Sequence, residues 1–202
     1  MKNWKVIAPL ALTAAGALAT GLAVLLKKTD EAAPAGEKAA PAAKPIDPAR
    51  LKTGSYSFIS GYRDAVTVEA TLPYDSERFS FAVVEEDFIS ETSDSHAALL
   101  YGPDFNLQLE YAAYYSGEDF ESLCASLREK HAWLRELSFG DNRCVGCRTG
   151  DNLSLFFPIP EDTASYLLVT VQKTPDFDGE LEELLEHPEL RTVLAGLRFR
   201  RA

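Results

Sequence analysis

The strongest constraint on this chain is an uncharged run near its start. Val6 to Leu26 spans 21 residues without an acidic or basic side chain. A helix of that length is about 30 Å long, which is the thickness of the hydrocarbon core of a bilayer. We therefore expect residues 1–28 to be a transmembrane anchor or a signal segment, with residues 6–26 in the membrane. The run is flanked by four lysines, Lys2, Lys5, Lys27 and Lys28.

A cleaved secretory signal is the alternative to an uncleaved anchor. Ala17-Leu18-Ala19 has the small-x-small form of a cleavage site. The apolar run nevertheless continues to Leu26 and stops at two lysines, which favours an anchor that is not removed. A short N-terminal tail normally stays in the cytoplasm. We therefore expect a single-pass protein of the cell membrane with an extracytoplasmic domain, or, after cleavage, a secreted soluble domain.

Residues 29–52 have the composition of a disordered linker. They contain few large apolar side chains among alanines, lysines and acidic residues, so they cannot bury enough surface to fold. Proline keeps such a segment extended. We expect one folded domain in residues 53–202, which is long enough to bury a core of its own. The prolines of the linker are Pro34, Pro41, Pro45 and Pro48.

The domain is strongly acidic. From Leu51 onward there are 27 Asp and Glu residues against 13 Lys and Arg residues, which gives a net charge of −14. An acidic surface repels phosphate backbones and anionic lipid headgroups. We therefore expect no nucleic acid among its partners, and we expect the charge to keep the domain soluble.

Apolar periodicity predicts an α+β domain. Apolar and polar residues alternate in several short segments that are separated by turn residues, and short turns favour antiparallel hairpins. Two turn signals, at Gly140 and Gly150, enclose a further short segment, Arg143–Thr149. The expected strands are Val66–Leu72, Phe79–Val83, Ala97–Tyr101, Phe105–Tyr111, Leu153–Phe157 and Tyr166–Gln172.

Helical periodicity appears twice. Apolar residues recur with a helical period from Phe120 to Leu134, and Ser116 with Asp119 is expected to cap that helix. The period returns in the C-terminal segment, where Pro188 can start a new helix. We expect a mostly antiparallel sheet with one mid-chain and one C-terminal helix packed on it, in addition to the N-terminal transmembrane helix.

The order of these segments resembles the PsbP-like α+β family. The resemblance implies an extracytoplasmic, anchored binding or assembly module rather than an enzyme. The acidic loop between residues 85 and 95 departs from the pattern. The residues that carry the resemblance are the strand Phe79-Ser80-Phe81-Ala82-Val83, the helix after Ser116, the hairpin that ends at Gln172, and the closing Leu194-Ala195-Gly196-Leu197-Arg198-Phe199.

Cys144-Val145-Gly146-Cys147 is the one motif with a named chemistry. A redox Cys-x-x-Cys places its first thiol at a helix N-terminus, but here the motif lies in an expected strand. Residues i and i+3 of a strand point to opposite faces, so the two thiols are not expected to bind one metal ion. We favour a structural or incidental role. The alternative is a thiol-based redox or metal-binding protein that uses Cys144 and Cys147, with Cys124 and His131 as further ligands.

The other polar candidates have structural explanations. His131 is expected on the apolar face of the mid-chain helix, His96 in a polar loop, and His187 directly before Pro188. An acidic run resembles a calcium loop at three positions but lacks the glycine and distal glutamate of that loop, so we expect it to favour a helix N-terminus. The run consists of Asp176, Asp178, Glu180, Glu182 and Glu183.

Three tyrosines, Tyr111, Tyr114 and Tyr115, are expected either to pack at the edge of the sheet or to line a groove for a ligand or partner. The chain has no Gly-x-Ser-x-Gly elbow, so serine hydrolase chemistry has no support. We therefore expect no catalytic, cofactor-binding or metal-ligating residue and no cofactor. The sequence favours a non-enzymatic binding or assembly module with a protein partner.

Overall fold

The computed structural model describes residues 49–60, 66–86, 95–114, 118–160, 162 and 165–201. The expected transmembrane segment and nearly all of the expected linker lie outside these residues, as do most of the acidic loop, Ser116 and Tyr115. Within the described part, no helix has the length and apolar character needed to cross a membrane.

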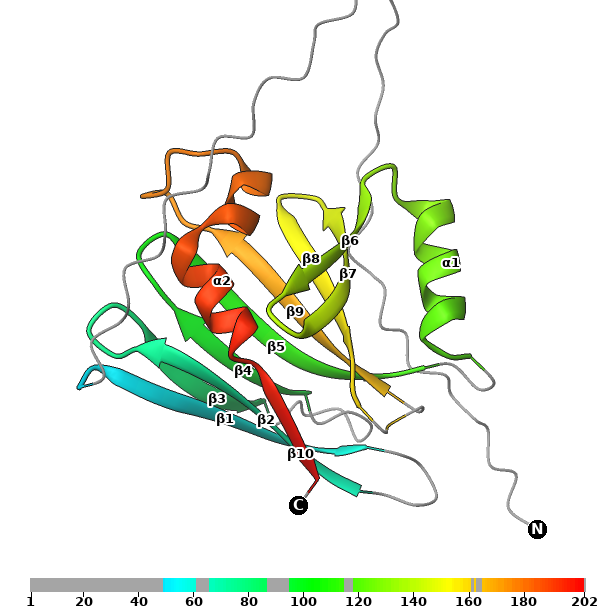
Figure 1. The fold of residues 1–202 in the computed structure, drawn as a ribbon, viewed down its shortest axis with the longest axis horizontal. Coiled ribbons are helices and arrows are strands. Elements are labelled where there is room, and N and C mark those ends of the chain that lie inside the picture. The colour runs from blue at the N-terminus through cyan, green and yellow to red at the C-terminus, as the bar shows by residue number, and fades with distance from the viewer. Residues whose placement is uncertain are drawn as a thin grey trace, which may run out of the picture. The chain divides into compact units, whose positions relative to one another are not determined.

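The described chain folds into two antiparallel sheets, two α-helices and one 3-10 helix (Figure 1). The expected α+β class with mainly antiparallel strands is confirmed, but the strands divide between two sheets. Sheet A has the order β1-β2-β10: β1 (Leu51–Ser60), β2 (Val66–Asp75) and β10 (Arg198–Arg201). Sheet B has the order β3-β4-β5-β9-β8-β7-β6: β3 (Ser80–Glu86), β4 (Ser95–Tyr101), β5 (Phe105–Ala113), β9 (Ser165–Lys173), β8 (Asn152–Pro158), β7 (Asn142–Thr149) and β6 (Leu134–Phe139).

The main core lies against one face of sheet B, here called the inner face. Strand alternation sends every second residue to this face, so that Leu100, Leu107 and Val171 stand in one buried row across β4, β5 and β9. Sheet A, the 3-10 helix η1 (Leu181–Glu186) and the helix α2 (Pro188–Ala195) supply the other side of the core. Gly54 permits close approach of the two sheets, because a Cβ there would lie 2.5 Å from the Phe81 ring.

The opposite, outer face of sheet B carries a second and smaller core. The helix α1 (Phe120–Lys130) buries Cys124 and Leu127 against this face. Its partners on the sheet belong to β6, β7, β8 and β9. They are Leu134, Val145, Cys147, Phe156, Tyr166 and Leu168.

The mid-chain helix is shorter than its periodicity predicts. It ends at Lys130, and His131 is its C-cap. The expectation that His131 and Leu134 continue the helix is wrong, because Leu134 begins β6 and pairs with Cys147 of β7. The N-cap is Asp119, whose carboxylate accepts hydrogen bonds from the backbone N–H and hydroxyl of Ser122.

Two strands are not among those expected from the sequence. Strand β6 begins at Leu134, where the helical period appears to continue. Strand β1 lies in a serine-rich segment in which only Gly54, Tyr56 and Phe58 alternate as buried positions. Leu51 and Lys52, which we assigned to the linker, are the first two residues of β1.

The turn signals and the start of the last helix agree with the sequence. Gly140 and Gly150 have positive φ angles of 58° and 61° and connect β6 to β7 and β7 to β8. Pro188 begins α2 as expected, and the chain then enters β10, which pairs with β2. The C-terminal end of α2 is held by Asn142, whose side-chain amide donates to the carbonyls of Leu194 and Leu197 at 2.8 and 3.0 Å.

Candidate functional site

The two thiols of the Cys-x-x-Cys motif lie on opposite faces of sheet B. Cys144 belongs to the main core on the inner face, whereas Cys147 belongs to the small core under α1. This confirms the strand-based expectation that they point apart. A disulfide within the motif, or one metal ion held by both sulfurs, therefore does not fit β7.

The electrostatics of the three cysteines do not favour thiolates. Burial raises the pKa of Cys144 to about 12. Burial also raises the pKa of Cys147, although the Thr149 hydroxyl at 3.7 Å offsets part of the rise. The pKa of Cys124 is likewise raised, mainly by burial. All three sulfurs are free thiols and buried, and in each case burial outweighs the groups that lower the pKa, whereas a reactive cysteine has a lowered pKa.

The remaining sequence candidates separate from one another. Tyr111 stacks on Phe58 at 4.9 Å beside the main core, while Tyr114 lies against Tyr166 at 5.1 Å near the small core. These two tyrosines therefore do not line one groove. In the acidic run, the carboxylate of Glu182 pairs with Arg148 at 2.9 Å. Its pKa is lowered first by a hydrogen bond to its own backbone N–H and then by Arg148, which fits a helix-start role.

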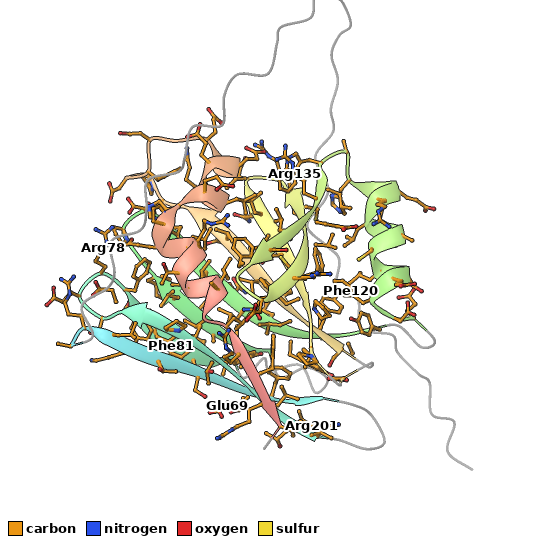
Figure 2. All side chains as sticks on the ribbon, viewed as in Figure 1. Glu69, Arg78, Phe81, Phe120, Arg135 and Arg201 are labelled. Atoms are coloured by element: carbon orange, nitrogen blue, oxygen red, sulfur yellow. The ribbon has the colours of Figure 1, made fainter. Side chains whose placement is uncertain are left out.

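A group of charged side chains joins three turns at one end of the domain, and we call it the Arg78 cluster. Arg78, in the turn between β2 and β3, donates to a carboxylate oxygen of Asp104 at 2.9 Å and to one of Glu189 at 2.8 Å. Nε2 of His187 lies 3.5 Å from the same oxygen of Asp104. Figure 2 places Arg78 beside α2, where Glu189 occupies the first turn.

The Arg78 cluster is partly shielded from solvent. The side chains of Asp104 and Glu189 are each 24% exposed, and that of His187 is 17% exposed. Nδ1 of His187 and Oε2 of Glu189 are buried without a hydrogen-bond partner. Burial raises the pKa of Glu189, against the lowering effect of Arg78. A buried acceptor without a donor is costly, so these atoms mark where the cluster is incomplete.

The members of this cluster could not be brought together from the sequence. Asp104 lies in the expected hairpin turn and His187 directly precedes a proline, but neither position indicates a partner. Arg78 and Glu189 are more than 100 positions apart, and no local spacing relates them. The described residues that meet as possible metal ligands are Asp104, His187 and Glu189.

The outer face of sheet B is covered unevenly. The small core under α1 occupies β6 to β9, whereas the outward side chains at positions 80–84 of β3 and 97–101 of β4 remain partly or fully exposed. Tyr101 is 47% exposed and stands next to Leu99 along β4. We call this region the bare half of the sheet. Its apolar residues are Ala82, Val84, Ala97, Leu99 and Tyr101.

A hollow of about 250 Å³ opens between β6, η1 and α2. Arg191 lies over the Phe139 ring at 5.7 Å and also pairs with Glu186 at 3.4 Å. Arg135, labelled in Figure 2, stacks on Trp133 at 5.2 Å. Both arginines of its lining therefore already contact other side chains of the domain, and three glutamates, Glu182, Glu183 and Glu186, also line the hollow.

Comparisons of the chain with protein-family models, with curated proteins and with solved structures found no match.

Proposed function

We propose that this protein is a membrane-tethered, non-enzymatic binding module whose domain binds a protein partner through the bare half of sheet B. The observation that carries the proposal is the exposure of Ala82 and Tyr101, with the partly exposed Leu99 beside them, on a sheet face that α1 covers only in part. The solvent-facing side of an antiparallel sheet is ordinarily polar. An exposed apolar patch is instead typical of an interaction site.

The charge distribution supports the same proposal. The domain carries 27 acidic and 13 basic residues. Among the outward residues at 80–84, 97–101 and 106–112, only Glu110 is charged. Charged residues are depleted and tyrosine is enriched at the centres of protein interfaces. A partner with an uncharged, apolar surface would therefore match this face.

The buried cysteines support a non-enzymatic role over the thiol-based alternative. The pKa values of all three thiols are raised by burial, and the two sulfurs of the motif face away from each other. A redox site needs an exposed thiol with a lowered pKa. Nothing in this arrangement supplies one.

We further propose that residues 6–26 hold the module in the membrane, and that the domain is a PsbP-like α+β module on the extracytoplasmic side. The uncharged length of the N-terminal run supports the anchor. The succession of β3, α1, the β8–β9 hairpin, α2 and β10 supports the resemblance. Fold resemblance leaves the partner open, because one fold serves many functions.

Photocrosslinking in intact cells tests the proposal. A benzophenone-bearing phenylalanine analogue replaces Tyr101 in the full chain, and the membrane fraction is analysed after irradiation. We expect one adduct of defined mass in that fraction, on a chain that keeps its N-terminal residues. A chain found only in the soluble fraction would contradict the anchor.

Two matched variants make the test specific. The same analogue at Ile59, which is 65% exposed on β1 of the other sheet, is expected to give no adduct. Ala82→Arg places a charge on the bare half and is expected to abolish the adduct at position 101 without changing the unfolding temperature. Equal adducts at both positions, or an adduct that Ala82→Arg leaves intact, would argue against this surface.

A further inference from the structure

Asp104, His187 and Glu189 bring three ligand atoms to one place from two distant parts of the chain. Asp104 lies in the turn between β4 and β5, and the other two lie where η1 passes into α2. One ligand atom from each lies within 4.8 Å of the other two. An imidazole nitrogen with two carboxylate oxygens is a donor set that suits zinc and neighbouring first-row divalent ions.

The spacing of these atoms is close to that of a metal site. Ligand atoms that each lie about 2.1 Å from a tetrahedral zinc ion are about 3.4 Å apart. Nε2 of His187 and Oδ2 of Asp104 are already 3.5 Å apart. The rings of Phe105 and Phe177 meet the imidazole edge-on at 5.5 and 6.0 Å, which restricts its orientation.

The cluster also has an excess of unmatched acceptors. Arg78 supplies one positive charge to two carboxylates, and it contacts Oε1 of Glu189 while Oε2 stays buried without a donor. A cation that contacts Oε2 of Glu189 would balance the second carboxylate charge and would also give this oxygen a partner.

We infer that Asp104, His187 and Glu189 form a binding site for a divalent first-row transition-metal ion of the zinc class, in competition with Arg78. The Arg78 side chain is 43% exposed, so it can turn toward solvent when the ion enters. Water would complete the coordination, because all three ligands reach the surface. Calcium and magnesium prefer sites made entirely or mainly of oxygen, so they fit this donor set less well. The inference is independent of the bare half of the sheet.

Zinc titration of the full chain in detergent, followed by NMR of isotope-labelled histidine rings, tests the inference. The chain has three histidines, His96, His131 and His187. Zinc is expected to shift the ring signals of His187 and to leave the other two in place, and magnesium or calcium at the same concentration is expected to shift none. The His187→Gln variant assigns the signal. Equal shifts at all three histidines, or no shift at His187, would overturn the inference.

Arg78→Gln is the decisive variant, because it removes a competing cation and no ligand. Zinc affinity is expected to rise about tenfold or more, since a positive charge a few ångströms from the ion is lost. Arg148→Gln removes an arginine that pairs with Glu182 elsewhere on the domain, and it should leave the affinity unchanged. If Arg78→Gln leaves the zinc affinity unchanged, the three residues serve only as partners of the guanidinium and the inference fails.

Discussion

The two α-helices of this domain are attached to it in different ways. The helix α2 places Leu190, Val193 and Leu194 in the main core with almost no exposure. The helix α1 is three residues longer but buries only Cys124 and Leu127, in a small core of its own. Length in a helix is therefore a poor guide to its importance for the fold.

The ends of the two helices also differ in how they are held. The C-terminal end of α2 is held by Asn142 of β7, and its first turn is tied to Arg78 through Glu189. The α1 N-terminus is capped only by its neighbour Asp119. The link of α1 to the sheet through an ion pair, Arg128 with Glu136 of β6 at 3.1 Å, is exposed. We therefore expect α2 to open only with the rest of the domain and α1 to open separately.

Substitutions in the two cores are expected to give the largest difference between the helices. Leu190→Ala in α2 is expected to lower the free energy of unfolding by about 3–4 kcal/mol, because it removes a fully buried side chain and leaves a cavity. Leu127→Ala in α1 is expected to cost about half as much, since its small core can collapse onto the gap. Urea denaturation followed by circular dichroism measures both. Equal losses of unfolding free energy in the two variants would contradict the difference between the two cores.

The buried thiols Cys144 and Cys124 predict a second difference, in how the free energy of unfolding falls at alkaline pH. Burial raises the pKa of Cys144 to about 12, so this thiol stays neutral in the folded state while the unfolded state ionises from about pH 9 upward. The stabilisation is therefore complete below pH 9. It is lost between pH 9 and 12, at up to about 1.4 kcal/mol per pH unit.

We expect Cys144→Ala to make the free energy of unfolding fall less steeply with pH when it is measured from pH 8 to 11. Cys124→Ala is the matched control in α1. It should change the slope less, because Arg128 beside Cys124 offsets part of the effect of burial on its pKa. Identical slopes in the two variants would mean that both thiols are buried to the same degree.

The caps give the smallest effect. Asn142→Ala removes the amide that donates to the carbonyls of Leu194, Ala195 and Leu197 at and just after the end of α2, and it is expected to cost about 1–2 kcal/mol. Asp119→Ala removes the N-cap of α1 and is expected to cost about 0.5–1 kcal/mol. Hydrogen exchange adds the spatial detail, since Asp119→Ala should speed exchange in α1 alone. Faster exchange across sheet B would contradict a separate opening of that helix.

The sequence predicted those parts of the fold that local periodicity governs. The hairpin of β4 and β5 follows from Gly102-Pro103-Asp104 between two alternating runs, and its inward residues Leu107 and Leu109 are buried as expected. The separation of Cys144 and Cys147 also follows from strand geometry alone. In each case the information lies within about ten residues, so a single sequence suffices.

The parts that the sequence did not predict depend on distant contacts. Leu134 fits a helical period, but pairing with β7 draws it into β6. The third strand of sheet A comes from the pairing of β10 with β2, and no local pattern in the sequence predicts it. The Arg78 cluster is of the same kind, because Arg78, Asp104 and Glu189 become neighbours only when three turns converge.

The place of β10 in sheet A has a consequence for how the protein folds. Arg198 pairs with Thr71, 127 positions earlier, so sheet A is completed by one of the most distant pairings in the domain. Such pairings form slowly, because the chain must lose the entropy of closing a long loop before the strand contacts can stabilise it. Until residues 198–201 arrive, β2 has one open edge, and an unpaired edge invites aggregation. The arginines of β10, at positions 198, 200 and 201, then place positive charge at the edge that replaces it. The open edge of β2 is therefore the part of sheet A that we expect to be most prone to intermolecular pairing before β10 is in place.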